Sequence, residues 1–175
     1  MTVSIRPATP ADVPAITRIY AQAVLEGTAS FELEAPDAAE MTQRMATVRS
    51  AGLPYLAAES GGTFLGYAYA GLYHRRPGYR FTLEDSIYIA QDAQRRGVGR
   101  GLLAELIRQT EALGYRQMID VIGDSANAPS IGLHHAMGFR PVGTYQNVGF
   151  KFGRWLDSVL MQRALGPGAT NLPER

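Results

Sequence analysis

Apolar residues recur along the chain with two spacings, one typical of amphipathic helices and the other of strands. Helical spacing is bounded by capping signals, such as the Thr9-Pro10 start of the first helix and the Gly114 that closes the third. Shorter runs rich in β-branched and aromatic residues predict strands. The predicted helices cover 13–24, 37–51, 102–112 and 127–137, and the predicted strands cover 4–6, 55–58, 64–72, 81–90, 118–122, 139–145 and 155–161.

This order predicts an α/β fold, with a mixed and mostly antiparallel central sheet of about seven strands flanked by about four helices. A doubly wound parallel sheet is less favoured, because the Gly61-Gly62 pair joins two central strands as a hairpin. Residues 1–165 are expected to form one domain. Residues 166–175 lack apolar content and are expected to form a flexible tail.

Composition narrows the classes of function. The formal net charge is +1, so neither nucleic acid nor an anionic membrane is an expected partner. The chain has no cysteine, which excludes disulfides, thiolate metal sites and an enzyme-bound thioester. It also has no signal-like or membrane-spanning apolar run, and a cytoplasmic location is expected.

The most informative segment is the glycine-rich turn at residues 94–101, which lies between a predicted strand and a predicted helix. Backbone amides that converge at a helix start favour a pyrophosphate. A Walker loop would need Gly-Lys-Ser/Thr, which is absent, and a dinucleotide fingerprint is a weak alternative because Gly101 comes one place early. A tight turn without a ligand is the remaining explanation. Three arginines flank the glycines and favour a phosphate: Arg95, Arg96 and Arg100.

These residues resemble the GNAT acetyltransferase superfamily, in which Gln/Arg-x-x-Gly-x-Gly/Ala binds the pyrophosphate of acetyl-CoA. Further motifs resemble its phosphinothricin acetyltransferase branch, which acetylates phosphinothricin, methionine sulfoximine or methionine sulfone. The resemblance covers nearly the whole chain, from Ile5 to Gln162. The matching motifs are Gln94-x-x-Gly97-x-Gly99, Thr82-x-Glu84-x-Ser86-x-Tyr88, Asn127-x-x-Ser130, His134-x-x-x-Gly138-Phe139 and Gly149-Phe150-Lys151-x-Gly153-x-Trp155-x-Asp157.

The resemblance implies a GNAT fold whose central strands splay apart around acetyl-CoA as co-substrate. It places the pantetheine arm along one strand, the pyrophosphate on the amides of the glycine-rich turn, and a polar contact at the next helix start. The implied cofactor-binding residues are Ile87, Tyr88 and Ile89, then Arg95, Arg96, Gly97, Val98, Gly99 and Arg100, and finally Asn127, which could also serve only as a helix cap.

Glu84 is the candidate general base. Strand parity places it on one face with Thr82, Ser86 and Tyr88, and places Asp85 on the other. An ammonium substrate must lose a proton before it attacks a thioester, and a carboxylate with a raised pKa is suited to accept that proton. A solvated surface glutamate is the alternative.

His134 has two interpretations. The resemblance implies a second catalytic group there, and an imidazole can relay protons near neutral pH. A hydrogen-bonded structural histidine is the alternative, because the helix that carries it also packs. No metal is expected, since His134 and His135 are adjacent and point to different sides of the helix.

The arginine loop, residues 74–80, is a candidate for substrate binding, because guanidinium groups bind an amino-acid carboxylate in a bidentate way. A solvated basic loop is the alternative, and the choice between Arg75 and Arg76 stays open. The resemblance implies a substrate contact for the exposed-looking Phe31 as well. The candidate substrate residues are Phe31, Arg75, Arg76, Arg80, Glu84 and Ser86.

The predicted function is therefore direct acetyl transfer to the α-amine of a small amino-acid analogue. No Gly-x-Ser-x-Gly elbow supports a covalent serine intermediate. Acetylation of another amine, such as a protein N-terminus or a polyamine, is the alternative reaction, and a non-catalytic acyl-CoA-binding module is the alternative class. The resemblance also implies a homodimer through residues 149–155.

Overall fold

The protein is described by a computed structural model that covers residues 2–173. One sheet of seven strands runs through it, in the order β1-β2-β3-β4-β5-β7-β6. Every neighbouring pair is antiparallel except β4 and β5, which are parallel. The strands are β1 (Ser4–Pro7), β2 (Tyr55–Ser60), β3 (Thr63–Leu72), β4 (Thr82–Ile89), β5 (Gln117–Gly123), β6 (Arg140–Lys151) and β7 (Arg154–Ala164).

The helices start where the sequence supplies caps. The Asp37 carboxylate accepts the backbone N–H of Glu40 at the start of the second helix, and Asn127 accepts that of Ser130 at the start of the fourth. Short 3₁₀ turns at Pro10–Asp12, Pro77–Tyr79 and Gln91–Ala93 connect the elements. The helices are α1 (Val13–Glu26), α2 (Ala38–Ser50), α3 (Val98–Ala112) and α4 (Ala128–Ala136).

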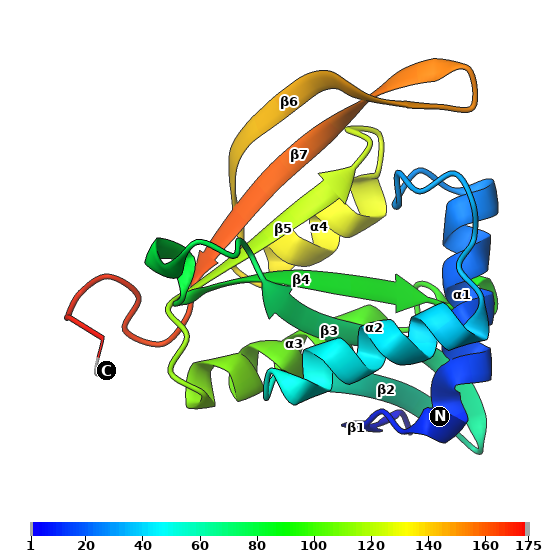
Figure 1. Ribbon diagram of the computed structural model, residues 1–175, viewed down its shortest axis with the longest axis horizontal. Coiled ribbons are helices and arrows are strands. Elements are labelled where there is room, and N and C mark those ends of the chain that lie inside the picture. Colours follow the sequence, from blue (N-terminus) through cyan, green and yellow to red (C-terminus); the bar gives the residue numbers. More distant parts are fainter. Residues whose placement is uncertain (1, 174–175) are drawn as a thin grey trace.

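Helices cover both faces of the sheet (Figure 1). Each face buries its own apolar cluster. On one face, α1 and α2 pack against the tyrosines of β2 and β3, with Ile16 and Met45 buried between them. On the other face, α3 buries Leu102, Leu103 and Leu106 against the sheet, and residues of α4 pack on the same cluster. Burying such side chains is the main source of stability.

The feature that positions the site is a separation between β4 and β5. The two strands pair at only three positions, Thr82 with Gln117, Leu83 with Met118 and Glu84 with Ile119. Beyond Glu84 they diverge, and Figure 1 shows β4 and β5 leaving a common base in different directions. This opening, between residues 85–89 of β4 and 120–123 of β5, is the strand split. The predicted mixed, mostly antiparallel sheet of about seven strands is confirmed, and its strands splay apart at the centre.

Two predicted strands were too short. β6 continues to Lys151, because irregularities at Pro141/Gly143 and Tyr145/Gly149 let its pairing with β7 resume. β7 continues to Ala164, because its last residues pair with the start of β5, Ala164 with Gln117. Arg116, just before β5, donates to Gly168 O and to Asn171 Oδ1, so the segment 166–173 is held at the start of β5. Residues 174–175 of the predicted tail lie outside the described residues. Between residues 2 and 173, no helix is long and apolar enough to cross a membrane.

Candidate active site

Glu84 is the last residue of β4 that pairs with β5, so its side chain lies at the mouth of the strand split. Within residues 2–173 its carboxylate has no hydrogen bond or ion pair. Burial, followed by the negative charges of Asp120 and Asp85, raises its pKa from 4.5 to about 7. A carboxylate with this pKa can accept a proton near neutral pH.

The face of β4 that carries Glu84 is bordered by a pocket of about 230 Å³ rich in tyrosines. Tyr69 of β3 lies opposite Ser86 and Tyr67 opposite Tyr88, so the pocket continues the row of side chains that starts at Glu84. Sequence reasoning missed these tyrosines, although their alternation along β3 signals one shared face. The pocket is lined by Tyr20, Met41, Arg44, Thr47, Val48, Tyr55, Tyr67 and Tyr69.

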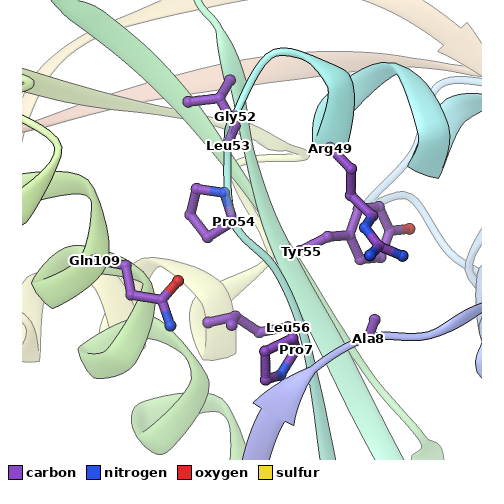
Figure 2. A pocket seen from close by; sticks show the side chains of 9 residues that line it. All are labelled: Pro7, Ala8, Arg49, Gly52, Leu53, Pro54, Tyr55, Leu56 and Gln109. Carbon is purple, nitrogen blue, oxygen red and sulfur yellow. The ribbon is translucent and has the colours of Figure 1, made fainter.

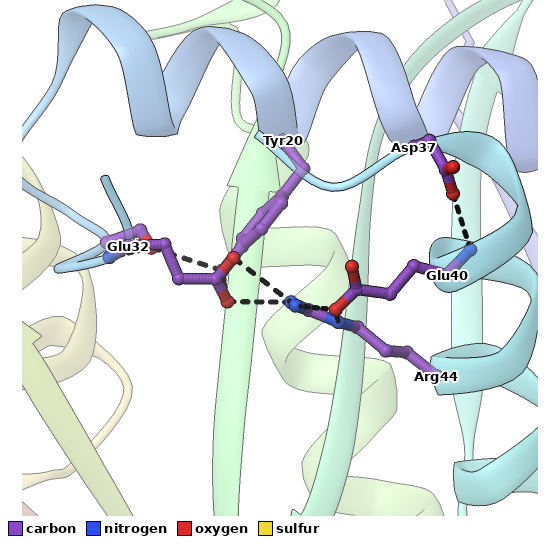
Figure 3. Close-up of polar contacts among 6 residues, drawn as sticks. Tyr20, Glu32, Asp37, Glu40 and Arg44 are labelled. Atoms are coloured by element: carbon purple, nitrogen blue, oxygen red, sulfur yellow. Dashed lines mark hydrogen bonds and ion pairs between the residues drawn. The ribbon is translucent and has the colours of Figure 1, made fainter. Parts of the chain in front are cut away.

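A charged group fixes the rim of this pocket (Figure 3). Arg44 Nη1 donates to Glu32 Oε1 at 2.7 Å, and Arg44 also pairs with Glu40 one turn earlier in α2. The Tyr20 hydroxyl donates to the same Glu32 oxygen at 2.9 Å. Glu32 therefore ties the loop between α1 and α2 to both helices.

Phe31, next to Glu32, is half-buried rather than exposed. Its ring packs over two glycines, so that a Cβ at Gly149 would lie 2.4 Å from the ring and a Cβ at Gly123 would lie 3.0 Å from it. Lys151 holds the same loop from β6, where its Nζ donates to Gly27 O and Ser30 O at 2.9 and 2.7 Å. Phe31 thus lies against the ends of β5 and β6.

The glycine-rich turn has the geometry of an anion site. Gly97 has a φ of +80° and precedes α3, and no side chain caps the first amides of this helix. Arg95, Arg96 and Arg100 are exposed around it. The helix start therefore offers free N–H donors together with positive charge.

The third helix begins at Val98, four residues before the predicted start, so Gly99 and Gly101 lie in its first turn, where they serve packing. A Cβ at Gly99 would lie 3.1 Å from Leu133 Cδ2, and a Cβ at Gly101 would lie 2.9 Å from Ile5 Cδ1. Their small size brings α3 close to α4 and to β1.

The other predicted cofactor residues lie around the same opening. Ile87, Tyr88 and Ile89 are half-buried along the free edge of β4, where β5 has separated. Asn127 lies in the loop after β5 and caps α4.

The face of β4 opposite Glu84 carries a buried cluster of Asp85, His134 and Asp120. His134 Nε2 lies 3.0 Å from Asp85 Oδ2, and Nδ1 lies 3.0 Å from Asp120 Oδ2 and 2.9 Å from the carbonyl of Ser130. The side chains of His134 and Asp85 are fully buried. Although burial alone would lower the pKa of His134, the hydrogen-bonding carboxylates of Asp120 and Asp85 outweigh it and raise that pKa.

Sequence spacing did not reveal this group, because its members come from β4, β5 and α4. Their ligand-type atoms lie within 4.8 Å of one another, as in a metal site. Both ring nitrogens face acceptors, however, and a carbonyl oxygen can only accept, so Nδ1 carries a proton. The imidazole thus lies between two carboxylates, which is the arrangement of an ionic cluster.

The arginine loop lies at the start of β4. Arg75 and Arg76 are exposed, whereas Arg80 is stacked on Phe81 and donates to Pro77 O. His74 and His135 are both exposed. A second pocket, of about 240 Å³, lies between α2, α3 and the start of β2 (Figure 2). None of the predicted site residues lines it, so it carries no part of this chemistry.

Comparison with known proteins agrees with this geometry. Residues 5–160 match the acetyltransferase (GNAT) domain. The chain is 59% identical to a phosphinothricin N-acetyltransferase of Alcaligenes faecalis over 93% of its length and 83% of the relative's. It is 41% identical to an L-methionine sulfoximine/L-methionine sulfone acetyltransferase of Pseudomonas aeruginosa, over 95% of this chain and 97% of that one.

A solved structure is also close. A GNAT phosphinothricin acetyltransferase from Sinorhizobium meliloti, in complex with acetyl-CoA, superposes with a TM-score of 0.97 at 45% identity, covering 100% of this chain and 95% of that one. The chain belongs to the GNAT acetyltransferase family. It is an acetyltransferase, and acetyl-CoA as its co-substrate is confirmed.

Proposed function

We propose that this enzyme transfers the acetyl group of acetyl-CoA to the α-amine of a small amino-acid analogue such as phosphinothricin, methionine sulfoximine or methionine sulfone. The observation that carries the proposal is Glu84, an unpaired carboxylate with a pKa of about 7 at the mouth of the strand split. The activities named for the relatives from Alcaligenes faecalis and Pseudomonas aeruginosa support this substrate class.

Glu84 is the general base of this mechanism. It accepts one proton from the substrate ammonium, directly or through water, and the free amine then attacks the thioester carbonyl in a ternary complex. The C–N bond forms and the C–S bond breaks, and the proton that the nitrogen then loses passes to the sulfur, so that CoA leaves as the thiol. A backbone N–H near Ile89, on the unpaired edge of β4, donates to the oxygen that becomes negative.

Acetyl-CoA is held by the backbone in this proposal. The amides of residues 95–100 and the start of α3 bind its pyrophosphate, with Arg95, Arg96 and Arg100 adding charge. The pantetheine arm lies along Ile87, Tyr88 and Ile89, and Asn127 contacts it from the start of α4.

The substrate carboxylate binds to the arginine loop. Arg75 and Arg76 are exposed and free of side-chain hydrogen bonds within residues 2–173, and Arg80 lies beside them. Phe31, which lies against Gly123 and Gly149, and Ser86, on the Glu84 face of β4, are the other two proposed substrate contacts. Arg75, Arg76 and Arg80 are each replaced by Ala in separate variants. The variant that loses the carboxylate contact should show a KM for the amino acid that is about tenfold higher or more. An unchanged KM in all three variants would disprove carboxylate binding.

The proposed reaction is tested by measuring CoA release with each of the three analogues, an unmodified amino acid, a polyamine and an N-terminal peptide. Saturation by one of the analogues, with no turnover of the polyamine or the peptide, is the expected result. Turnover of the peptide or polyamine alone would assign another amine, and acetyl-CoA binding without any turnover would indicate a binding module.

We propose further that the enzyme is a homodimer. The β6–β7 hairpin projects from the body of the molecule (Figure 1) and leaves five large apolar side chains more than half exposed: Tyr145, Val148, Phe150, Phe152 and Trp155. Phe150 and Trp155 pack against each other at 5.1 Å, and so many exposed apolar side chains on one hairpin are typical of an interface. Light scattering should give twice the chain mass for the wild type and the single mass for Trp155→Glu, whereas a monomeric wild type would contradict the proposal.

A further inference from the structure

The pairing of β4 with β5 stops at one particular pair of residues. The parallel register brings Glu84 to Ile119, so the next pair would set Asp85 directly against Asp120. Like charges opposite each other in a ladder oppose pairing. The strand split therefore begins where two carboxylates would otherwise meet.

The ring of His134 lies between these carboxylates. It reaches them from α4, with one nitrogen 3.0 Å from Asp85 Oδ2 and the other 3.0 Å from Asp120 Oδ2. A planar imidazole is a spacer of fixed size, because it keeps the two oxygens apart while Nε2 is hydrogen-bonded to Asp85 and the charged ring attracts Asp120. Phe139 packs edge-on against the ring at 5.0 Å and fixes its orientation.

The cluster leaves polar groups unsatisfied. Within residues 2–173, Asp85 Oδ1 and Asp120 Oδ2 are buried without a hydrogen bond in good geometry. Such groups are destabilising, and their presence in a folded core calls for a functional explanation.

We propose that Asp85, His134 and Asp120 form a spacer that fixes the width of the strand split, so that the slot between β4 and β5 fits the arm of acetyl-CoA. This inference rests on one part of the proposed function, the binding of acetyl-CoA in the strand split. His134 is then a positioning residue. Its side chain is fully buried on the face of β4 opposite Glu84, where it has no route to the substrate amine.

The helix that carries the spacer also contacts the rest of the cofactor site. Leu133, the neighbour of His134, packs against Gly99 of α3. A Cβ added at Gly99 would lie 3.1 Å from Leu133 Cδ2 and 3.7 Å from Ile87 Cδ1 of β4. One helix therefore sets the distance between β4, β5 and the glycine-rich turn. A change in the spacer should act on cofactor binding before it acts on chemistry.

The test compares His134→Gln with His135→Gln, a matched control on the exposed side of the same helix. CoA alone is titrated by calorimetry, and the steady-state constants for acetyl-CoA are measured beside it. We expect His134→Gln to weaken CoA binding about tenfold or more and to raise the KM for acetyl-CoA more than it lowers kcat. His135→Gln should match the wild type.

Three results would overturn the spacer proposal. A folded His134→Gln that binds CoA within about twofold of the wild type would overturn the spacer. A fall in kcat with unchanged CoA binding would also overturn the spacer and would make His134 a proton carrier.

If circular dichroism shows that His134→Gln does not fold, the Asp120→Asn variant is measured in its place, because the asparagine keeps the shape of the side chain and removes one charge. We expect CoA binding about three- to tenfold weaker in Asp120→Asn, and unchanged binding would refute the proposal. Failure of the wild type to bind CoA would instead contradict the cofactor assignment itself.

Discussion

Glu84 and Asp85 are neighbours in sequence but occupy opposite faces of β4 at the point where the strand leaves β5. Asp85 is fully buried and its Oδ2 lies 3.0 Å from His134 Nε2. Glu84 is half-buried, and no hydrogen bond or ion pair reaches it within residues 2–173. Burial raises the pKa of both carboxyl groups, but only Asp85 has a partner that opposes the rise.

The difference shows how one strand supplies two kinds of carboxylate. A partner stabilises the charge and keeps a side chain in place, which suits a structural or positioning role. An unpaired, partly buried carboxylate is destabilising when charged, and for that reason it binds a proton more tightly. The predictions below separate the two roles, beginning with the largest effect.

Glu84→Gln should lower kcat/KM by about 10²–10⁴, because the amide cannot take a proton from the substrate ammonium. Binding of CoA, measured by calorimetry, should stay within about twofold of the wild type, since the cofactor contacts lie beyond Glu84 on β4. Full activity of Glu84→Gln at neutral pH would show that another group is the base.

Asp85→Ala should instead act on stability. It removes one partner from a buried ion cluster and leaves the His134 proton without an acceptor, a change that typically lowers the free energy of unfolding by about 3–5 kcal/mol. Glu84→Ala, the matched control one residue away, should not lower it, because the charged Glu84 has no partner to lose and is itself destabilising above pH 7. Urea unfolding at pH 7.5 measures both. Equal losses in the two variants would remove the distinction drawn between the carboxylates.

Much of this contrast follows from the sequence. The alternation along residues 82–89 places Glu84 and Asp85 on opposite faces, and the capping residues and glycines mark the helix ends. The glycine-rich turn was found because its chemistry is carried by consecutive residues.

The partners of these residues could not be found in the same way. Asp85, Asp120 and His134 come from three elements, so only the three-dimensional register of β4 with β5 and the placement of α4 bring them together. Phe31 looked exposed because its loop is polar, yet it is covered through the absence of side chains at Gly123 and Gly149. The tyrosine pocket likewise combines residues of α1, α2 and two strands.

The pH dependence of the reaction sharpens the comparison further. Glu84 must be ionised to act as a base, so kcat/KM should rise with pH and level off above the pKa of about 7. Below that value it should fall about tenfold for each pH unit. The same profile measured with Glu84→Gln should lack this acidic limb. A limb centred near the ordinary glutamate value of 4.5 would mean that Glu84 is solvated in the working enzyme.

The smallest effect is on stability as a function of pH. The pKa of Glu84 is about 7 in the folded state and near 4.5 in the unfolded chain, so between these values the folded state retains a proton that the unfolded state releases. The free energy of unfolding contributed by this group therefore falls as pH rises from 4.5 to 7 and is constant above. Glu84→Gln has no such titration. The difference in unfolding free energy between this variant and the wild type should therefore shift in favour of the variant by about 1–2 kcal/mol from pH 4.5 to pH 8. This figure is smaller than the full pKa shift would give, because the side chain is partly exposed and screened by solvent. Urea unfolding of both proteins is measured at the two pH values, and the contributions of the other titrating groups cancel in the difference between the proteins. Glu34→Gln, at an exposed position, is the control. A difference of the opposite sign would mean that a cation stabilises the Glu84 carboxylate in the folded protein. Glu84 would then be a paired carboxylate like Asp85, and the contrast between the two residues would be lost.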